Sequence, residues 1–225
     1  MTLRHAIKLH QHRGNKLITP PAEEPVTTDE LKSHLRLSGS DEDAYLSALI
    51  TEARTTIEDQ LNLAMVDQTW EVALDNWGHS SASWWDGVRD GAMADVFAPD
   101  AKSSVEMPRY PLDSVTSVKT YDEDSTETDV TVATTFDVDV YRVPGRLTLK
   151  AGATWPVATR ANNAIIIQYI AGYGTASDVP APLKRAVRQL ASYMYEHRGD
   201  GCSAGEALAD SGVMSILDAY KVKEV

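Results

Sequence analysis

The chain has 225 residues, of which 43% are hydrophobic and 24% are charged, as is typical of a globular protein with a core of its own. Cys202 is the single cysteine, which excludes a disulfide framework and a thiolate metal cluster. No run approaches the roughly 18 apolar residues of a membrane helix, and the N-terminus lacks the apolar stretch of a signal peptide, so synthesis inside the cell is expected.

The net charge of −12 is unevenly distributed along the chain. The first 20 residues contain four basic residues, Arg4, Lys8, Arg13 and Lys16, and no acidic residue. The remainder therefore holds all 33 acidic residues against 17 of the 21 basic ones. Phosphate contacts dominate the affinity of proteins for DNA, so a body this acidic argues against tight DNA binding.

Residues 1–25 predict an extended N-terminal arm. His10 and His12 have a spacing that suits a metal site on a strand, but no carboxylate or cysteine accompanies them at ligand spacing. We therefore interpret them as part of a polar tail. Three prolines over residues 20–25 favour extended backbone directly before the first helix.

Residues 26–65 predict a helical hairpin. Thr27 and Glu30 have the spacing of a capping box, which opens a short helix that we expect to end near Gly39. Ser40 is expected to begin the second helix. An apolar stripe follows this second helix at spacings of three and four residues, formed by Leu46, Ile50, Ala53, Ile57 and Leu61. The stripe requires a packing partner elsewhere in the chain.

The periodicity changes from helical to alternating after Met65. Short runs with the composition of strands follow at residues 69–74, 104–107, 115–121, 130–133, 136–143, 146–150 and 164–170. The acidic run at 122–129 lacks a central glycine and lies between strands, so we interpret it as a hairpin tip and not as an EF-hand calcium loop. The sequence thus predicts a small antiparallel β module over residues 67–178.

A long loop is expected over residues 78–101, which are rich in Gly, Ser and Asp. Trp84 and Trp85 stand next to each other in this loop. Adjacent aromatic side chains in a polar loop are typical of an interaction anchor, and they are equally compatible with packing over the edge of a sheet. The sequence leaves both interpretations open.

Helical periodicity returns near the C-terminus. Prolines at positions 180 and 182 fit the first turn of a helix, and Gly199 ends it. A last amphipathic segment spans Val213–Tyr220. The fold class expected is α+β: a helical core domain, residues 26–66 and 179–225, combines the N-terminal hairpin with C-terminal helices, and the β module is inserted into it.

The sequence contains no motif of a known catalytic site. It has no GxxxxGK[ST] phosphate loop, no GxGxxG after a strand, no HExxH and no GxSxG elbow. His34 and His197 fall on expected helices, where a surface or core histidine is the common case. We therefore expect no enzymatic activity, no cofactor and no metal site.

Several stretches in order resemble the head–tail connector (adaptor) proteins of tailed bacteriophages, in the group with a β insertion in the helical core. They begin at residue 17 and extend to about residue 220, and they include Leu17–Pro21, Glu24–Thr27, His34–Arg36, Asp41–Asp43, Gln68–Trp70, Pro108–Leu112, Trp155-Pro156, Tyr169–Gly174, Val179-Pro180 and Tyr195-Glu196. The first 15 residues and the loop 78–101 depart from the family pattern.

The resemblance implies a structural role. Such proteins form a ring, commonly of twelve copies, beneath the portal at the capsid vertex, where the ring extends the DNA channel. The expected partners are further copies of this chain, a portal protein and a downstream neck, stopper or tail protein. Genomic DNA would pass without specific binding, because an acidic lining repels phosphate. The expected location is the neck of a virion made in the cytoplasm of a bacterial host, without membrane contact.

The resemblance also suggests interface residues. Family members often contact the portal through the C-terminal segment, which makes Ile216, Leu217 and Tyr220 candidates for an anchor that orders on binding. A closed ring needs two different complementary faces on each copy, and the outward side of the second helix, at Ala48 and Thr55, is a candidate for one of them.

Two other function classes remain as alternatives. The first is an adhesion or carbohydrate-binding module, in which the β insertion and its loop stack Trp84 and Trp85 on a sugar. The second is a hydrolase that uses carboxylates of the β module. Neither has a sequence motif comparable to the ordered resemblance.

Overall fold

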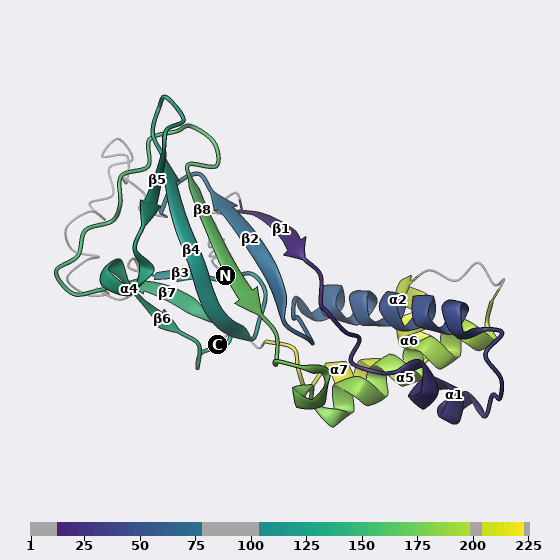
Figure 1. Ribbon diagram of the computed structural model, residues 1–225. Coiled ribbons are helices and arrows are strands. Elements are labelled where there is room, and N and C mark those ends of the chain that lie inside the picture. Colours follow the sequence, from purple (N-terminus) through teal and green to yellow (C-terminus); the bar gives the residue numbers. More distant parts are fainter. Residues whose placement is uncertain (1–12, 78–103, 199–203, 223–225) are drawn as a thin grey trace, which may run out of the picture. The chain divides into compact units, whose positions relative to one another are not determined.

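The computed structural model of the chain describes residues 13–77, 104–198 and 204–222 (Figure 1). Contacts divide the chain into two compact units. The β unit comprises Met1–Ile18, Trp70–Pro108 and Ser114–Tyr169, and the helical unit comprises Thr19–Thr69, Arg109–Asp113 and Ile170–Val225. Helices and antiparallel strands are both present, which confirms the α+β fold class. No helix within the described ranges is long and apolar enough to cross a membrane.

The first helix of the helical unit begins as the sequence predicts. Helix α1 (Thr28–Leu35) starts at a capping box, in which Thr27 Oγ1 accepts from Glu30 N at 3.2 Å and Glu30 Oε2 accepts from Thr27 N at 2.9 Å. Its expected end near Gly39 is wrong, because Arg36 adopts a left-handed conformation (φ 59°) and closes the helix earlier.

Helix α2 (Asp43–Leu61) begins after Glu42, and the expected start at Ser40 is therefore also wrong. Its apolar stripe is confirmed, because every member of the stripe is buried. The stripe packs against α5 (Ala181–Glu196), which also contacts α1, α6 (Ala204–Asp210) and α7 (Met214–Leu217). Helix α6 was not predicted, although Ala207 and Leu208 are buried in the same core.

Two antiparallel sheets make up most of the described β unit. The larger has the strand order β1-β2-β8-β4-β5, with β1 (Arg13–Thr19), β2 (Gln68–Leu74), β8 (Ile165–Ala171), β4 (Leu112–Tyr121) and β5 (Glu127–Val130). The smaller has the order β3-β7-β6, with β3 (Ser104–Glu106), β7 (Arg146–Leu149) and β6 (Phe136–Asp139). Figure 1 shows the two sheets as separate layers of this unit.

Two segments differ from the sequence-based expectation. Strand β1 lies within the predicted arm, where no strand was expected. The run at 130–133, expected to be a strand, instead leads into the one-turn helix α4 (Val132–Thr135), because the backbone amides of Thr134 and Thr135 both donate to Thr131 O. A short 3-10 helix, η2 (Ala176–Asp178), precedes α5.

Burial in the β unit alternates along the strands, as one covered face requires. On β2, Gln68, Trp70, Val72 and Leu74 are buried while the residues between them are partly exposed. The rings of Trp77, Phe136 and Trp155 contact one another, with centroids 4.8–5.6 Å apart. Trp77 Nε1 donates to the carbonyl of Pro156 at 2.8 Å, so the buried indole is satisfied.

Candidate interaction surfaces of the helical unit

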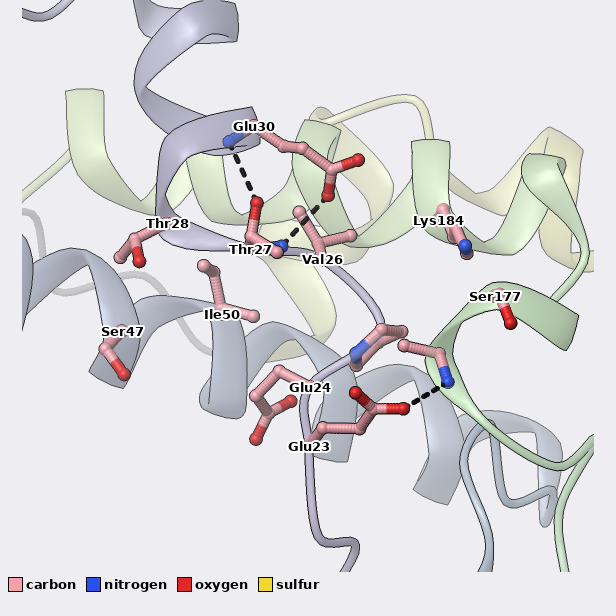
Figure 2. A pocket seen from close by; sticks show the side chains of 12 residues that line it. Glu23, Glu24, Val26, Thr27, Thr28, Glu30, Ser47, Ile50, Ser177 and Lys184 are labelled. Atoms are coloured by element: carbon pink, nitrogen blue, oxygen red, sulfur yellow. Dashed lines mark hydrogen bonds between the residues drawn. The ribbon is translucent and has the colours of Figure 1, made fainter.

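A groove of about 360 Å³ opens beside the start of α1 (Figure 2). Its walls come from the segment before α1, from α2 at Ser47 and Ile50, and from η2 and the first turn of α5. Two of its carboxylates already accept backbone hydrogen bonds: Glu23 from Ala176 N at 2.7 Å, and Glu30 from the capping box. Glu23 therefore joins the segment before α1 to η2, and Glu30 closes the first turn of α1.

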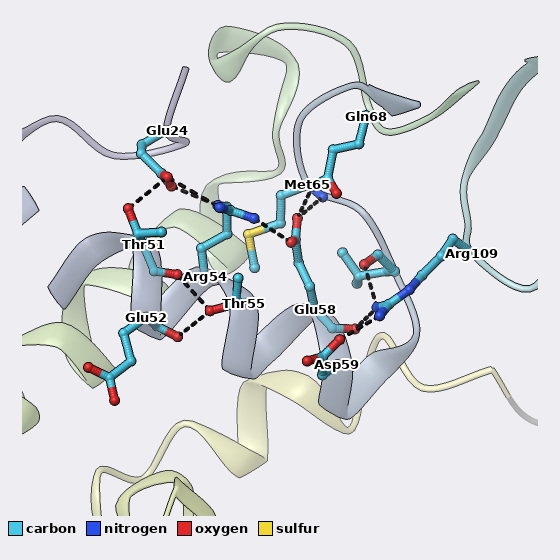
Figure 3. Close-up of polar contacts among 11 residues, drawn as sticks. Glu24, Thr51, Glu52, Arg54, Thr55, Glu58, Asp59, Met65, Gln68 and Arg109 are labelled. Carbon is cyan, nitrogen blue, oxygen red and sulfur yellow. Dashed lines mark hydrogen bonds and ion pairs between the residues drawn. The ribbon is translucent and has the colours of Figure 1, made fainter. Parts of the chain in front are cut away.

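The third carboxylate of the groove belongs to a buried ionic network (Figure 3). Glu24 accepts from Arg54 Nε at 2.7 Å, and Arg54 Nη1 donates to Glu58 Oε2 at 2.6 Å. Glu58 Oε1 accepts from Met65 N at 2.7 Å and from Gln68 Nε2 at 2.8 Å. The side chains of Arg54 and Glu58 are only 7% and 5% exposed. The network thus fastens both the segment before α1 and the segment after α2 to the middle of α2.

Burial and pairing shift the two central groups in a consistent way. Burial raises the pKa of Glu58, because the charge of Arg54 and the hydrogen bonds from Met65 and Gln68 offset only part of the desolvation. Burial alone would lower the pKa of Arg54, but its hydrogen bond to Glu24 and the charges of Glu58 and Glu24 raise it above its ordinary value. Arg54 therefore remains charged, and any proton taken up by this pair goes to Glu58.

The C-terminal end of α2 is capped by residues that are distant in sequence. Arg109 Nη1 donates to Glu58 O at 2.8 Å, and Nη2 contacts Asp59 Oδ1 at 2.5 Å. Tyr110 OH donates to Leu61 O at 2.5 Å. A guanidinium at a helix C-terminus also interacts favourably with the helix dipole.

Sequence reasoning missed these polar residues as a group. The available signal was the spacing of Arg54 and Glu58, four residues apart beside the apolar stripe. Such a pair usually lies on the solvent side of a helix, so the spacing by itself does not reveal burial. Arg109 falls in a stretch that carried the family resemblance, but nothing in that stretch indicates that it caps α2.

The structure places two of the candidate ring-interface residues on the open side of α2. Ala48 and Thr55 are both exposed. Thr55 Oγ1 donates to Thr51 O at 2.8 Å, so its hydroxyl is satisfied within the helix. The exposed acidic side chains of Glu52 and Asp59 lie on the same side of α2, three or four residues from Ala48 or Thr55.

The candidate C-terminal anchor is packed on its own helical unit. Leu217 is 0% exposed and belongs to the core, while Ile216 and Tyr220 are half-buried against it. Tyr220 O also accepts from Tyr110 OH at 3.3 Å. Of the three residues, Ile216 and Tyr220 therefore keep some surface for a partner, whereas Leu217 serves the fold.

The other sequence-based candidates lie elsewhere. Trp84 and Trp85 fall outside the described residues. Across residues 13–77, 104–198 and 204–222, no three His, Cys, Asp or Glu side chains are grouped so that they could hold a metal ion.

The segment that contains the helical hairpin is similar to a known protein family. Residues 25–81 match the family model of phage gp6-like head-tail connector proteins. This segment begins just before the capping box and includes α1, α2 and β2. No curated protein matches the chain. The resemblance to head–tail connectors noted in the sequence is thus confirmed by an independent match on the hairpin.

Solved structures similar to this chain come from gene transfer agent (GTA) particles. The neck of an empty GTA particle computed with C6 symmetry contains a chain of 23% identity, with a TM-score of 0.70 and coverage of 94% of this chain and 97% of that one. The neck of a native GTA particle computed with C12 symmetry gives 23%, 0.68, 94% and 97%. The virion of a native GTA particle gives 24%, 0.69, 94% and 96%. At these identities the likeness establishes a shared fold over nearly the full length of the chain.

Proposed function

We propose that this chain, whose helical hairpin matches the head–tail connector family, is a structural protein of the neck of a phage-like particle. The family match on residues 25–81 is the observation that carries this conclusion. This segment contains the capping box, the buried stripe of α2, and Arg54, Glu58, Met65 and Gln68 of the ionic network. The likeness in fold to chains of GTA necks and virions supports the same role and the same location.

A connector of this kind acts through its shape and its surfaces. In the ring that we propose, of twelve copies, each subunit presents two different complementary faces, because head-to-tail contacts that close on themselves require them. The open side of α2 around Ala48 and Thr55 is one such face. Necks computed with C6 and C12 symmetry among the similar structures support a ring assembly.

The remaining partners follow from the position of such a ring. The portal protein binds on one side, in part through the half-buried Ile216 and Tyr220, and a downstream neck, stopper or tail protein binds on the other. Genomic DNA passes through without specific contacts, because a chain with a net charge of −12 repels phosphate. A connector role implies no catalysis, and we propose that this protein performs none.

The direct test is negative-stain electron microscopy of the purified protein mixed with the portal protein from the same particle. A ring of density at the base of the portal is the expected result. Failure to associate with portal or capsid under any condition tested would contradict the proposal. Portal alone and this protein alone are the two controls.

A further inference from the structure

Strand β1 forms one edge of the five-stranded sheet, with β2 as its only neighbour within the described part of the chain. An edge strand directs alternate backbone N–H and C=O groups away from the sheet, where another strand can pair with them. Leu17 and Ile18 on this strand are 40% and 38% exposed, and Lys16 is exposed as well. A seven-residue edge with apolar side chains in solvent has the properties of a strand that pairs with another chain.

Strand β5 forms the opposite edge of the same sheet, and its only neighbour among the described strands is β4. Its acidic residues, Glu127 and Asp129, are both exposed. Glu127 already contacts Lys119 Nζ at 2.5 Å and Tyr121 OH at 2.8 Å. Asp129 is therefore the acidic group of this edge better placed to meet a new cation.

The side chains of the two edges can be assigned to faces of the sheet. Val118 and Thr120 of β4 are buried and lie opposite Val130 and Thr128, so these residues of β5 belong to the covered face. Asp129 lies opposite Lys119, on the other face.

The same assignment holds at the β1 edge. A Cβ atom built on Gly14 would lie 3.8 Å from Cβ of Ala73, a residue on the less buried face of β2. Asn15 Oδ1 accepts from the hydroxyl of the fully buried Tyr169 at 3.2 Å, which places Asn15 on the covered face. Because side chains alternate along a strand, Lys16 lies on the open face and Leu17 on the covered one.

We propose that β1 of one copy pairs with β5 of the next copy, so that the sheet continues from subunit to subunit. The two edges match on both faces of such a sheet. Lys16 meets Asp129 on the open face, and Leu17 meets Val130 on the covered face, where the exposed leucine becomes buried. Opposite charges and apolar pairs across neighbouring strands are both stabilising.

A second copy of this chain is the occupant that these edges favour. The edges differ from each other and lie at opposite ends of one sheet, which is the arrangement that head-to-tail association in a ring requires. The N-terminal segment, which includes β1, is basic, and the rest of the chain, which includes β5, is acidic. The overall charge distribution therefore also favours contact between β1 of one copy and β5 of the next. The inference rests on the proposed ring function and adds to it a specific contact between subunits. With four residues in β5, the ladder is short.

Disulfide crosslinking tests the contact. The variant Lys16→Cys with Asp129→Cys, in a Cys202→Ser background, is concentrated, oxidised and run on a non-reducing gel. Covalent dimers, trimers and higher species are expected. Four strand spacings, roughly 19 Å, separate the two edges within one sheet, so a disulfide inside one subunit is out of reach.

The matched control pairs Lys16→Cys with Thr128→Cys. Thr128 is adjacent to Asp129 but lies on the covered face, so crosslinking should fall to the level of the single-cysteine variants. If both cysteine pairs gave covalent oligomers in equal amounts, the proposal would be overturned. That result would show that the two strands come into contact without the open and covered faces of the neighbouring sheets being aligned.

Charge exchange gives a second readout. Lys16→Glu and Asp129→Lys should each weaken association in sedimentation velocity, and the double variant should recover at least part of it. Rings visible by microscopy without a crosslinked ladder would overturn the edge pairing and leave the connector role intact. Absence of both rings and ladder would overturn both proposals.

Discussion

Arg54 shows how one residue can determine the local structure of several segments. Its guanidinium reaches Glu24 before α1 and Glu58 one turn further along α2, and Glu58 in turn holds the backbone of Met65. An Arg–Glu pair four residues apart is common on exposed helix faces, where it contributes little. Here both side chains are withdrawn from water, so loss of one leaves the other charge buried without compensation.

Replacement of Arg54 by Met should therefore lower the free energy of unfolding by about 3–5 kcal/mol, because Glu58 and Glu24 lose their shared cation. Urea denaturation followed by circular dichroism measures the change. Lys221→Met, which removes an exposed pair with Asp218, is the control and should change stability by about 1 kcal/mol or less. Equal losses in the two variants would contradict a special role for the buried network.

Glu42 illustrates a pH-dependent contact on the surface. Hydrogen bonds from the Tyr195 hydroxyl and then from Arg198 hold the pKa of Glu42 below its ordinary value of 4.5. The folded state thus binds a proton less readily than the unfolded state. The stabilisation is present above pH 4.5 and is lost as the pH falls through the folded-state pKa.

The variant Glu42→Gln should lower Tm at about pH 6 more than at about pH 3, since the carboxylate contributes only while it is ionised. Differential scanning calorimetry at the two pH values gives the comparison. The exposed Glu52→Gln on the same helix serves as the control. An identical decrease in Tm at both pH values would show that the Glu42 charge makes no difference to stability.

The two hairpin helices differ in how their ends are encoded. Helix α1 begins where Thr27 and Glu30 predict, because a capping box involves only residues within one turn. Helix α2 begins at Asp43 although Ser40 has good capping chemistry. Its N-cap residue Glu42 makes no capping hydrogen bond, since its carboxylate is bound to Tyr195 and Arg198 of the distant α5 region. Tertiary contacts thus replaced local ones at this end.

Removal of the α1 cap should have a defined cost. Thr27→Ala leaves the amide of Glu30 without its acceptor and should lower the free energy of unfolding by about 1 kcal/mol, within a range of about 0.5–2 kcal/mol. Thr28→Ala, one residue inside the helix, is the matched control and should have little effect. Chemical denaturation of both variants provides the measurement, and a larger loss in Thr28→Ala would refute the capping role.

At the scale of the whole molecule, the two sides of α2 have different roles, one in folding and one in assembly. Leu46 and Ile50 are buried against the rest of the helical unit, whereas Ala48 and Thr55 are exposed to solvent together with the acidic Glu52. The inner side determines whether a subunit folds. The outer side is free to meet a neighbouring copy in the proposed ring.

Charges introduced on the two sides should therefore separate folding from assembly. Leu46→Asp should unfold the helical unit, seen as loss of helical circular dichroism or aggregation during expression. Ala48→Arg and Thr55→Arg should keep the wild-type spectrum and Tm while they abolish rings on the portal in micrographs. Normal rings from both arginine variants would exclude this side of α2 as the subunit interface.

The sequence by itself determined the features that depend on near neighbours along the chain. The capping box at Thr27, the buried stripe of α2 and the proline-opened α5 all rest on spacing within one helix. The acidic hairpin tip expected at 122–129 is shorter than predicted, because Glu127–Val130 pair with β4 as strand β5. The order of short motifs also sufficed to indicate the connector family.

Only the tertiary structure decided what depends on distant partners. Strand β1 begins with the polar and basic residues 13–16 and has only two large apolar residues, and its conformation is set by pairing with β2, which lies some fifty residues further on. Burial of Arg54 and Glu58 became visible only when Glu24, Met65 and Gln68 came together around them. The sequence made Leu217 a candidate for contact with a partner, but in the structure its side chain is buried in the core of the helical unit. In each case the deciding energy comes from contacts between segments that no local pattern brings together.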